Sequence, residues 1–197
     1  MREHRRPSDA VRDAASAPRF VPWMALLIGV LAVSTASTAI KLAQQEVPSL
    51  AIAAWRLTFA TLMLLPFVSS PVRAAWKKLR RADWALLLFS GLVLAIHFHT
   101  WITSLAMTSV AASVVLVSVS PLFVVVLSWA LFREPLRLGT IAGIVVAITG
   151  SAIIGFEDLG QGTHQLRGDL LAVVGALAVA IYLLIGRRLR PSLPLVA

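Results

Sequence analysis

The chain has no cysteine, and only 14% of its 197 residues are charged. The absence of cysteine excludes disulfides and thiol chemistry, while it leaves the cellular compartment open. Scarce charge, 58% hydrophobic residues and a mean hydropathy of +0.85 exclude a soluble domain. Inside lipid, only helices and closed barrels satisfy every backbone polar group. The hydrophobic runs are long and do not alternate with polar residues, so they favour helices over barrel strands.

Charged residues are missing altogether between Asp83 and Arg133, that is, from residue 84 to residue 132. A single helix of this length would measure about 74 Å at 1.5 Å per residue. A bilayer core is only about 30 Å thick and needs about 20 apolar residues for each crossing. The run must therefore fold back once, and the weakly apolar Met107, Thr108 and Ser109 mark the expected turn. The sequence predicts a buried helical hairpin with Pro121 in its second arm.

The fold class predicted on this basis is an all-α, polytopic membrane bundle. Its six transmembrane helices are expected at residues 22–43, 48–69, 84–106, 109–132, 138–156 and 168–186. Pro71 is expected to end the second helix, and a loop is expected at residues 157–167. Between the second and third helices, the basic segment 72–83 has helical periodicity and is expected to lie on anionic headgroups.

The net charge of +9 is concentrated in short segments between the apolar runs. Basic residues in such places orient membrane spans, and this distribution argues against nucleic acid as a partner. It predicts a disordered, cytoplasmic basic tail at residues 1–21. A basic head, an apolar run and the small residues STASTA would also suit a cleavable secretory signal. The further spans, and the helical continuation through Ile40–Ala43, favour an uncleaved first helix.

An internal repeat is suggested by GVLAV from Gly29 and GALAV from Gly175. The second copy lies five spans after the first, and an odd offset makes it inverted. Inverted repeats are typical of transporters that hold substrate near mid-membrane at the repeat interface. Chance similarity is the alternative, because Ala, Leu, Val and Gly dominate all the spans.

The stretch AIKLAQQEVPSLAIAAWRLTFATLMLLP, with Lys41, Pro48 and Arg56, resembles the first hairpin of EamA-type members of the drug/metabolite transporter superfamily. The segment from His99 to Gly155 is similar to the third to fifth helices of that family. This resemblance covers about 135 residues and identifies 22–156 as a first five-helix repeat, with 168–190 as the first helix of a truncated second repeat. It implies a ten-helix inverted-repeat protein, most of whose second half would follow Ala197.

The function that the resemblance implies is secondary transport of small polar metabolites, such as amino acids or related compounds, by alternating access. The alternative is a truncated or non-transporting membrane subunit without independent activity. The expected partners are the lipid bilayer, a small-molecule substrate and, as an open alternative, a second copy in a homodimer. The expected location is a bacterial inner (plasma) membrane with the N-terminus in the cytoplasm. No cofactor, metal or catalytic residue is expected.

Polar residues within the spans are the candidates for contacting substrate. Ser34, Thr38 and Lys41 lie on one helical face, and so do Ser113 and Ser120 ahead of Pro121. Either stripe can line a cavity or allow close helix packing through small residues. Pro121 predicts a kink, which would serve as a hinge or be static.

Arg56 and His97 are the two other polar candidates, and Trp101 shares a helical face with His97. Arg56 is an anchor for a carboxylate or phosphate, or else it extends to the headgroups or pairs with Glu46. His97 is either a proton-coupling group or a buried imidazole with satisfied hydrogen bonds. His97 and His99 point to nearly opposite sides of a helix and cannot bind one metal together.

An intramembrane protease is disfavoured, because Gly150-Ser151 is not a G-x-S-x-G elbow and the histidines have no carboxylate partner within a span. There is also no phosphate-binding P-loop pattern that would couple the chain to ATP.

The predicted orientation can be tested directly, because a chain without cysteine accepts single reporter cysteines. In intact cells, a membrane-impermeant maleimide should label Gln45→Cys in the first outer turn. Ser8→Cys in the basic tail should react only after lysis. The reverse pattern would contradict a cytoplasmic N-terminus.

Overall fold

The computed structural model describes residues 20–67, 76, 79–133, 135, 138–159 and 162–190. Phe20 and Val21 already belong to a helix, while the remainder of the tail expected at 1–21 lies outside the described residues. Most of the expected interfacial helix at 72–83 also lies outside them, and its last three residues belong to α5. The chain divides into two compact units, Met1–Ala39 and Ile40–Ala197.

The described part of the chain is helical and contains no strand, which confirms the predicted all-α membrane class. Within the described ranges, four segments are long and apolar enough to cross a bilayer, and two shorter helices are also apolar. The long segments are Leu26–Ala43 of α2 (Phe20–Ala43), α5 (Arg81–Met107), Val110–Phe132 and α9 (Thr163–Leu189). The shorter ones are α3 (Ser49–Leu64) and Leu138–Ile153 of α8 (Leu138–Leu159).

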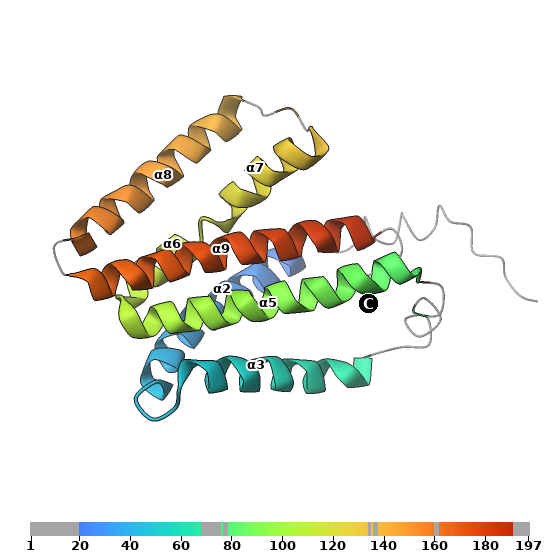
Figure 1. Cartoon of the computed structure of the whole chain (residues 1–197), viewed down its shortest axis with the longest axis horizontal. Coiled ribbons are helices and arrows are strands. Elements are labelled where there is room, and N and C mark those ends of the chain that lie inside the picture. The colour runs from blue at the N-terminus through green and yellow to red at the C-terminus, as the bar shows by residue number, and fades with distance from the viewer. Residues whose placement is uncertain are drawn as a thin grey trace, which may run out of the picture. The chain divides into compact units, whose positions relative to one another are not determined.

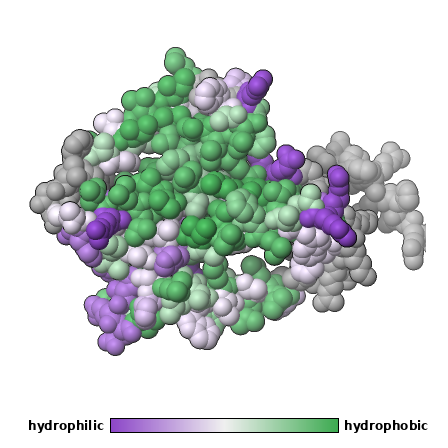
Figure 2. All heavy atoms as spheres, in the orientation of Figure 1, coloured by the Kyte–Doolittle hydropathy of each residue, from purple (hydrophilic) through white to green (hydrophobic). Residues whose placement is uncertain are grey.

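Large hydrophobic side chains remain exposed along these helices, as contact with lipid would require. Leu88 of α5 is 74% exposed and Val146 of α8 is 72% exposed. In the orientation of Figure 2, hydrophobic side chains cover most of α8 and α9, and hydrophilic ones gather near helix ends. In water such a surface would drive aggregation, whereas hydrocarbon solvates it.

The predicted hairpin is present, and its turn lies where the sequence placed it. α5 ends at Met107, Thr108 is extended, and Ser109 caps α6 (Val110–Val117) by accepting a 3.0 Å hydrogen bond from the Ala112 backbone N–H. At its start, α5 extends to Arg81 because the Asp83 carboxylate accepts a 3.0 Å hydrogen bond from the Arg80 backbone N–H. Hydropathy alone placed this start three residues later.

The second arm of the hairpin, in which Pro121 predicted a kink, is divided into two helices. α6 ends at Val117 and α7 (Ser120–Phe132) begins after Ser118 and Val119. Pro121 has no backbone N–H, so it cannot donate to the Val117 carbonyl as residue 121 of a continuous helix would.

Two expected boundaries were wrong. α3 ends at Leu64 and passes into a 3₁₀ turn, η1 (Leu65–Phe67), so that Pro66 rather than Pro71 ends the helix. The expected loop at 157–167 is much shorter, because α8 runs to Leu159 and α9 begins at Thr163 after Gly162, whose φ is 113°. The first turns of α9 contain polar residues, and a prediction from apolar runs overlooked them.

Within the second unit, α5 lies between α3 and α9, and both neighbours run antiparallel to it (Figure 1). α9 also contacts α6, α7 and α8. Its contact with α5 is close because Gly168 has no side chain. A Cβ at that position would lie 2.9 Å from the Thr108 backbone nitrogen and from the Cβ atoms of Met107 and Thr108. Small residues let membrane helices approach in this way, since lipid removes the hydrophobic drive for association.

Gly168→Ala is therefore expected to force α9 away from the hairpin turn and to destabilise the fold by about 1–3 kcal/mol. The matched control is Gly91→Ala, because a Cβ at Gly91 meets no atom within 4 Å. Thermal unfolding of the detergent-solubilised proteins should show a lower midpoint for the first variant only. Equal midpoints for the two variants would contradict the close contact.

Candidate functional site

The structure brings three of the nine sequence candidates together at one place in the second unit. Arg56 of α3 faces the aromatic side chains of α5, with its guanidinium carbon 5.1 Å from the ring centroid of Phe98 and 5.6 Å from that of Trp101. His97 stacks on Trp101 with ring centroids 6.1 Å apart and planes 12° apart. Arg56 is half-buried, whereas Trp101 and His97 are buried. A cation, two aromatic faces and an imidazole therefore form one cluster, here called the Arg56 cluster.

The guanidinium of Arg56 has no acidic partner among the residues that the structure describes. The expected alternative of a pair with Glu46 is not observed there. Cation–π contact stabilises the charge but occupies none of the five N–H donors of arginine. Arg56 is the eighth residue of α3, so it lies about 10 Å along the helix from Ser49 at 1.5 Å per residue. The cluster thus presents unoccupied donors well inside the span.

His97 connects the cluster to α9. Its Nδ1 lies 2.8 Å from the carbonyl oxygen of Gly175. A carbonyl oxygen only accepts, so Nδ1 carries the proton, and Nε2 is an acceptor when the ring is neutral. A Cβ at Gly175 would lie 3.1 Å from Thr100 Oγ1 and 3.5 Å from Trp101 Cβ. The missing side chain at Gly175 therefore lets α9 pack directly against the ring-bearing face of α5.

Ser113 lies in the contact between the two arms of the hairpin. Its hydroxyl is 2.6 Å from the hydroxyl of Ser104, which also donates a 2.7 Å hydrogen bond to the Trp101 carbonyl. Both serine side chains are fully buried. The pair links α6 to α5 next to the residue that forms the aromatic part of the cluster. The hydroxyl of Ser113 is therefore engaged in a contact between two helices of the hairpin.

Lys41, near the end of α2, contacts the C-terminal end of α5. Its ammonium donates hydrogen bonds to the carbonyl oxygens of Leu105 and Thr108, the second at 3.2 Å. Carbonyls at a helix C-terminus have no intrahelical donor and carry partial negative charge, so a cation there is stabilising. Gln44 reinforces the contact by donating to the Ile102 carbonyl at 2.6 Å and to Ser49 Oγ at 2.9 Å. The ammonium group of Lys41 is thus already hydrogen-bonded to backbone carbonyls of the protein itself.

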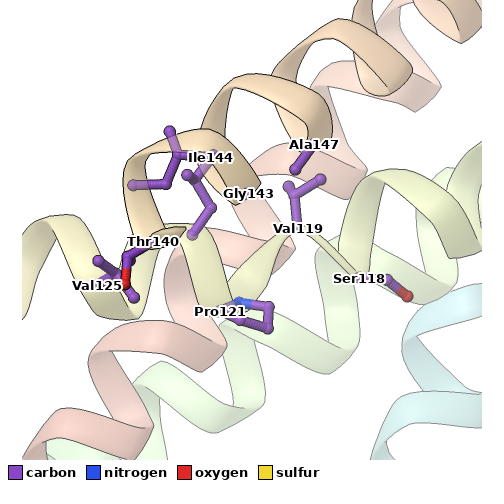
Figure 3. Close-up of a pocket in the computed structure, with 9 residues that line it drawn as sticks. Ser118, Val119, Pro121, Val125, Thr140, Gly143, Ile144 and Ala147 are labelled. Carbon is purple, nitrogen blue, oxygen red and sulfur yellow. The ribbon is translucent and has the colours of Figure 1, made fainter. Parts of the chain in front are cut away.

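Pro121 lines a groove of about 390 Å³ between the α6–α7 break and α8 (Figure 3). Thr140 contributes a hydroxyl, while Ser118 uses its own hydroxyl to donate to the Val114 carbonyl at 2.7 Å. The remaining lining is Val119, Leu122, Val125, Gly143, Ile144 and Ala147. Ser120, half-buried in the first turn of α7, does not line it. So apolar a groove suits hydrocarbon better than a polar solute.

Ser34 and Thr38 are exposed on the part of α2 that belongs to the first unit. Phe98 and Gln44, by contrast, were missed by reasoning from the sequence. Phe98 precedes Trp101 by three residues, and this i, i+3 spacing on α5 was the available signal. Among the described residues, no group of three or more His, Cys, Asp or Glu could hold a metal ion.

The long apolar helices, with polar residues inside them, define an integral membrane protein. The chain belongs to the EamA-like transporter family, whose family model matches residues 22–156. It is 29% identical over 167 residues to an uncharacterized transporter from Archaeoglobus fulgidus. The match covers 85% of this chain and 58% of that relative, so the chain spans little more than half of its length. No solved structure matches the chain.

The buried serine pair yields a stability prediction. Ser113→Ala should lower the free energy of unfolding by about 1 kcal/mol, because Ser104 loses a buried hydrogen-bonding partner. In a double-mutant cycle with Ser104→Ala, the coupling energy should be about 0.6 to 1.7 kcal/mol, as for other hydrogen bonds between membrane helices. Reversible unfolding in mixed micelles would measure it, and additive effects of the two substitutions would refute the contact.

Proposed function

We propose that this chain takes part in secondary transport of small polar metabolites, such as amino acids or related compounds, by alternating access. The observation that carries the proposal is the Arg56 cluster. It joins α3 to α5 of the expected first repeat, and His97 of α5 contacts α9, the first helix of the expected second repeat. Substrate held at a repeat interface near mid-membrane is the arrangement on which alternating access depends.

The chemistry of the cluster supports a polar solute. The N–H donors of Arg56 have no acceptor among the described residues. His97 has one acceptor nitrogen, Nε2, when its ring is neutral. A polar substrate that crosses hydrocarbon must exchange its hydration for contacts of this kind. The break before Pro121 adds a point where the second arm of the hairpin can bend. Membership of a transporter family supports the same function.

The competing proposal is a membrane subunit without activity of its own. For either function we propose the same location, a bacterial inner membrane with a cytoplasmic N-terminus. A homodimer is compatible with both functions.

Counterflow of radiolabelled amino acids into proteoliposomes containing the purified chain tests the proposal. We expect saturable uptake above that of protein-free vesicles, and loss of this uptake in Trp101→Leu, which removes one aromatic face beneath Arg56. His99→Gln is the matched control, because His99 lies on the same helix but is exposed. Failure of the unsubstituted chain to take up any member of the panel would favour the inactive subunit.

A further inference from the structure

We propose that the Arg56 cluster is a carboxylate subsite, in which Arg56 binds the carboxylate of a small organic acid over the faces of Phe98 and Trp101. This inference rests on the proposed transport function and deepens it by naming the charged group of the substrate. It is carried by the donors of Arg56, by the charge around it and by the packing that fixes its position.

The donors of Arg56 require acceptors that the described residues do not supply. A guanidinium has five N–H groups in a planar fork, which matches two carboxylate oxygens in a bidentate arrangement. Two aromatic faces at 5.1 and 5.6 Å hold the guanidinium but leave its edges unbonded. A second donor lies in the same cluster, since Nε1 of Trp101 is buried without an acceptor among the described residues. Unsatisfied buried donors are costly, and a bound oxyanion would remove that cost.

The charge around Arg56 also favours an anion. α3 contains no acidic residue, and Asp83 lies at the opposite end of α5 from Trp101, 18 positions earlier in the helix. At 1.5 Å per residue this separation is about 27 Å, far too long for an ion pair. The other acidic residue in these helices is Asp169 of α9, six positions before Gly175 and so about 9 Å along that helix from the residue that contacts His97. The positive charge of Arg56 is therefore not neutralised by a neighbouring carboxylate on its own or the adjacent helix.

The position of Arg56 is fixed by packing on both sides of its aromatic platform. Trp101 is 5% exposed and belongs to the buried cluster with Ile102 and Leu105. His97 stacks on the Trp101 ring and is itself held by the carbonyl of Gly175. The platform therefore cannot move away when a ligand approaches, and a preorganised site loses less entropy on binding.

Benzoate and benzamide form a suitable pair of probes, because they share size and ring and differ in charge. Calorimetry with the full chain in phosphatidylcholine nanodiscs should show benzoate binding more tightly than benzamide. Arg56→Gln should weaken benzoate binding by about 10- to 100-fold, the loss expected for a charge-assisted hydrogen-bonded pair, and should leave benzamide unchanged. Arg56→Lys keeps the charge but loses the planar fork of donors, so its affinity for benzoate should lie between those of the unsubstituted chain and Arg56→Gln. The control His99→Gln should bind benzoate as the unsubstituted chain does.

The proposal is overturned by equal binding of the two probes, or by benzoate binding that survives Arg56→Gln. If phosphatidylglycerol in the nanodiscs abolishes benzoate binding competitively, and only when Arg56 is present, the anion is a lipid phosphate and the carboxylate assignment is wrong. Comparable helix content and elution volume for Arg56→Lys guard against a folding artefact. Saturable amino acid uptake without carboxylate selectivity would refute the subsite but leave transport intact. Arg56-dependent benzoate binding without any uptake would support the subsite and contradict the transport function.

Discussion

Close contact between α5 and α9 is the constraint on which the described structure depends. Hydrocarbon solvates apolar side chains on the outside of the bundle as well as their neighbours do on the inside, so these helices cannot be held by the hydrophobic effect. Gly168 and Gly175 replace it with backbone proximity, which brings dispersion contacts and the hydrogen bond from His97 to Gly175 within reach. A methyl group at Gly168 would overlap the hairpin turn, and the two helices would separate.

The same contact orders the polar groups. α9 fixes His97, His97 stacks on Trp101, and Trp101 with Phe98 supports Arg56 of α3. The cluster is thus formed by residues of α3 and α5, and α9, which is distant in sequence, contacts it through Gly175. Lys41 and the serine pair, by comparison, satisfy backbone and side-chain groups around the hairpin turn, where lipid offers no water to do so. Polar residues within the spans therefore fall into two groups. Arg56 contacts aromatic rings, whereas Lys41 and the serine pair make hydrogen bonds around the hairpin turn.

The structure gives partners to several residues for which the sequence had left alternatives open. For Arg56 the sequence left open an anion anchor, an extension to the headgroups or a pair with Glu46, and among the described residues the guanidinium contacts two aromatic rings of α5. The stripe of Ser113 and Ser120 looked uniform along one helical face, but the break before Pro121 separates its members. Helix ends were predicted to within a few residues where a turn residue or a cap marked them. The start of α9 was misplaced because its first turns are polar.

The sequence by itself determined that this chain spans a membrane as helices, that residues 97–139 contain a hairpin with a proline in its second arm, and that residues 22–156 resemble a transporter repeat. The first two conclusions follow from local quantities, namely the length of an apolar run against the thickness of a bilayer and the missing N–H of proline, whereas the third is a resemblance of motifs. Tertiary structure alone decided which polar residues meet. That depends on the rotation of each helix about its axis and on where small residues permit close approach, and neither is encoded in the periodicity of a single segment.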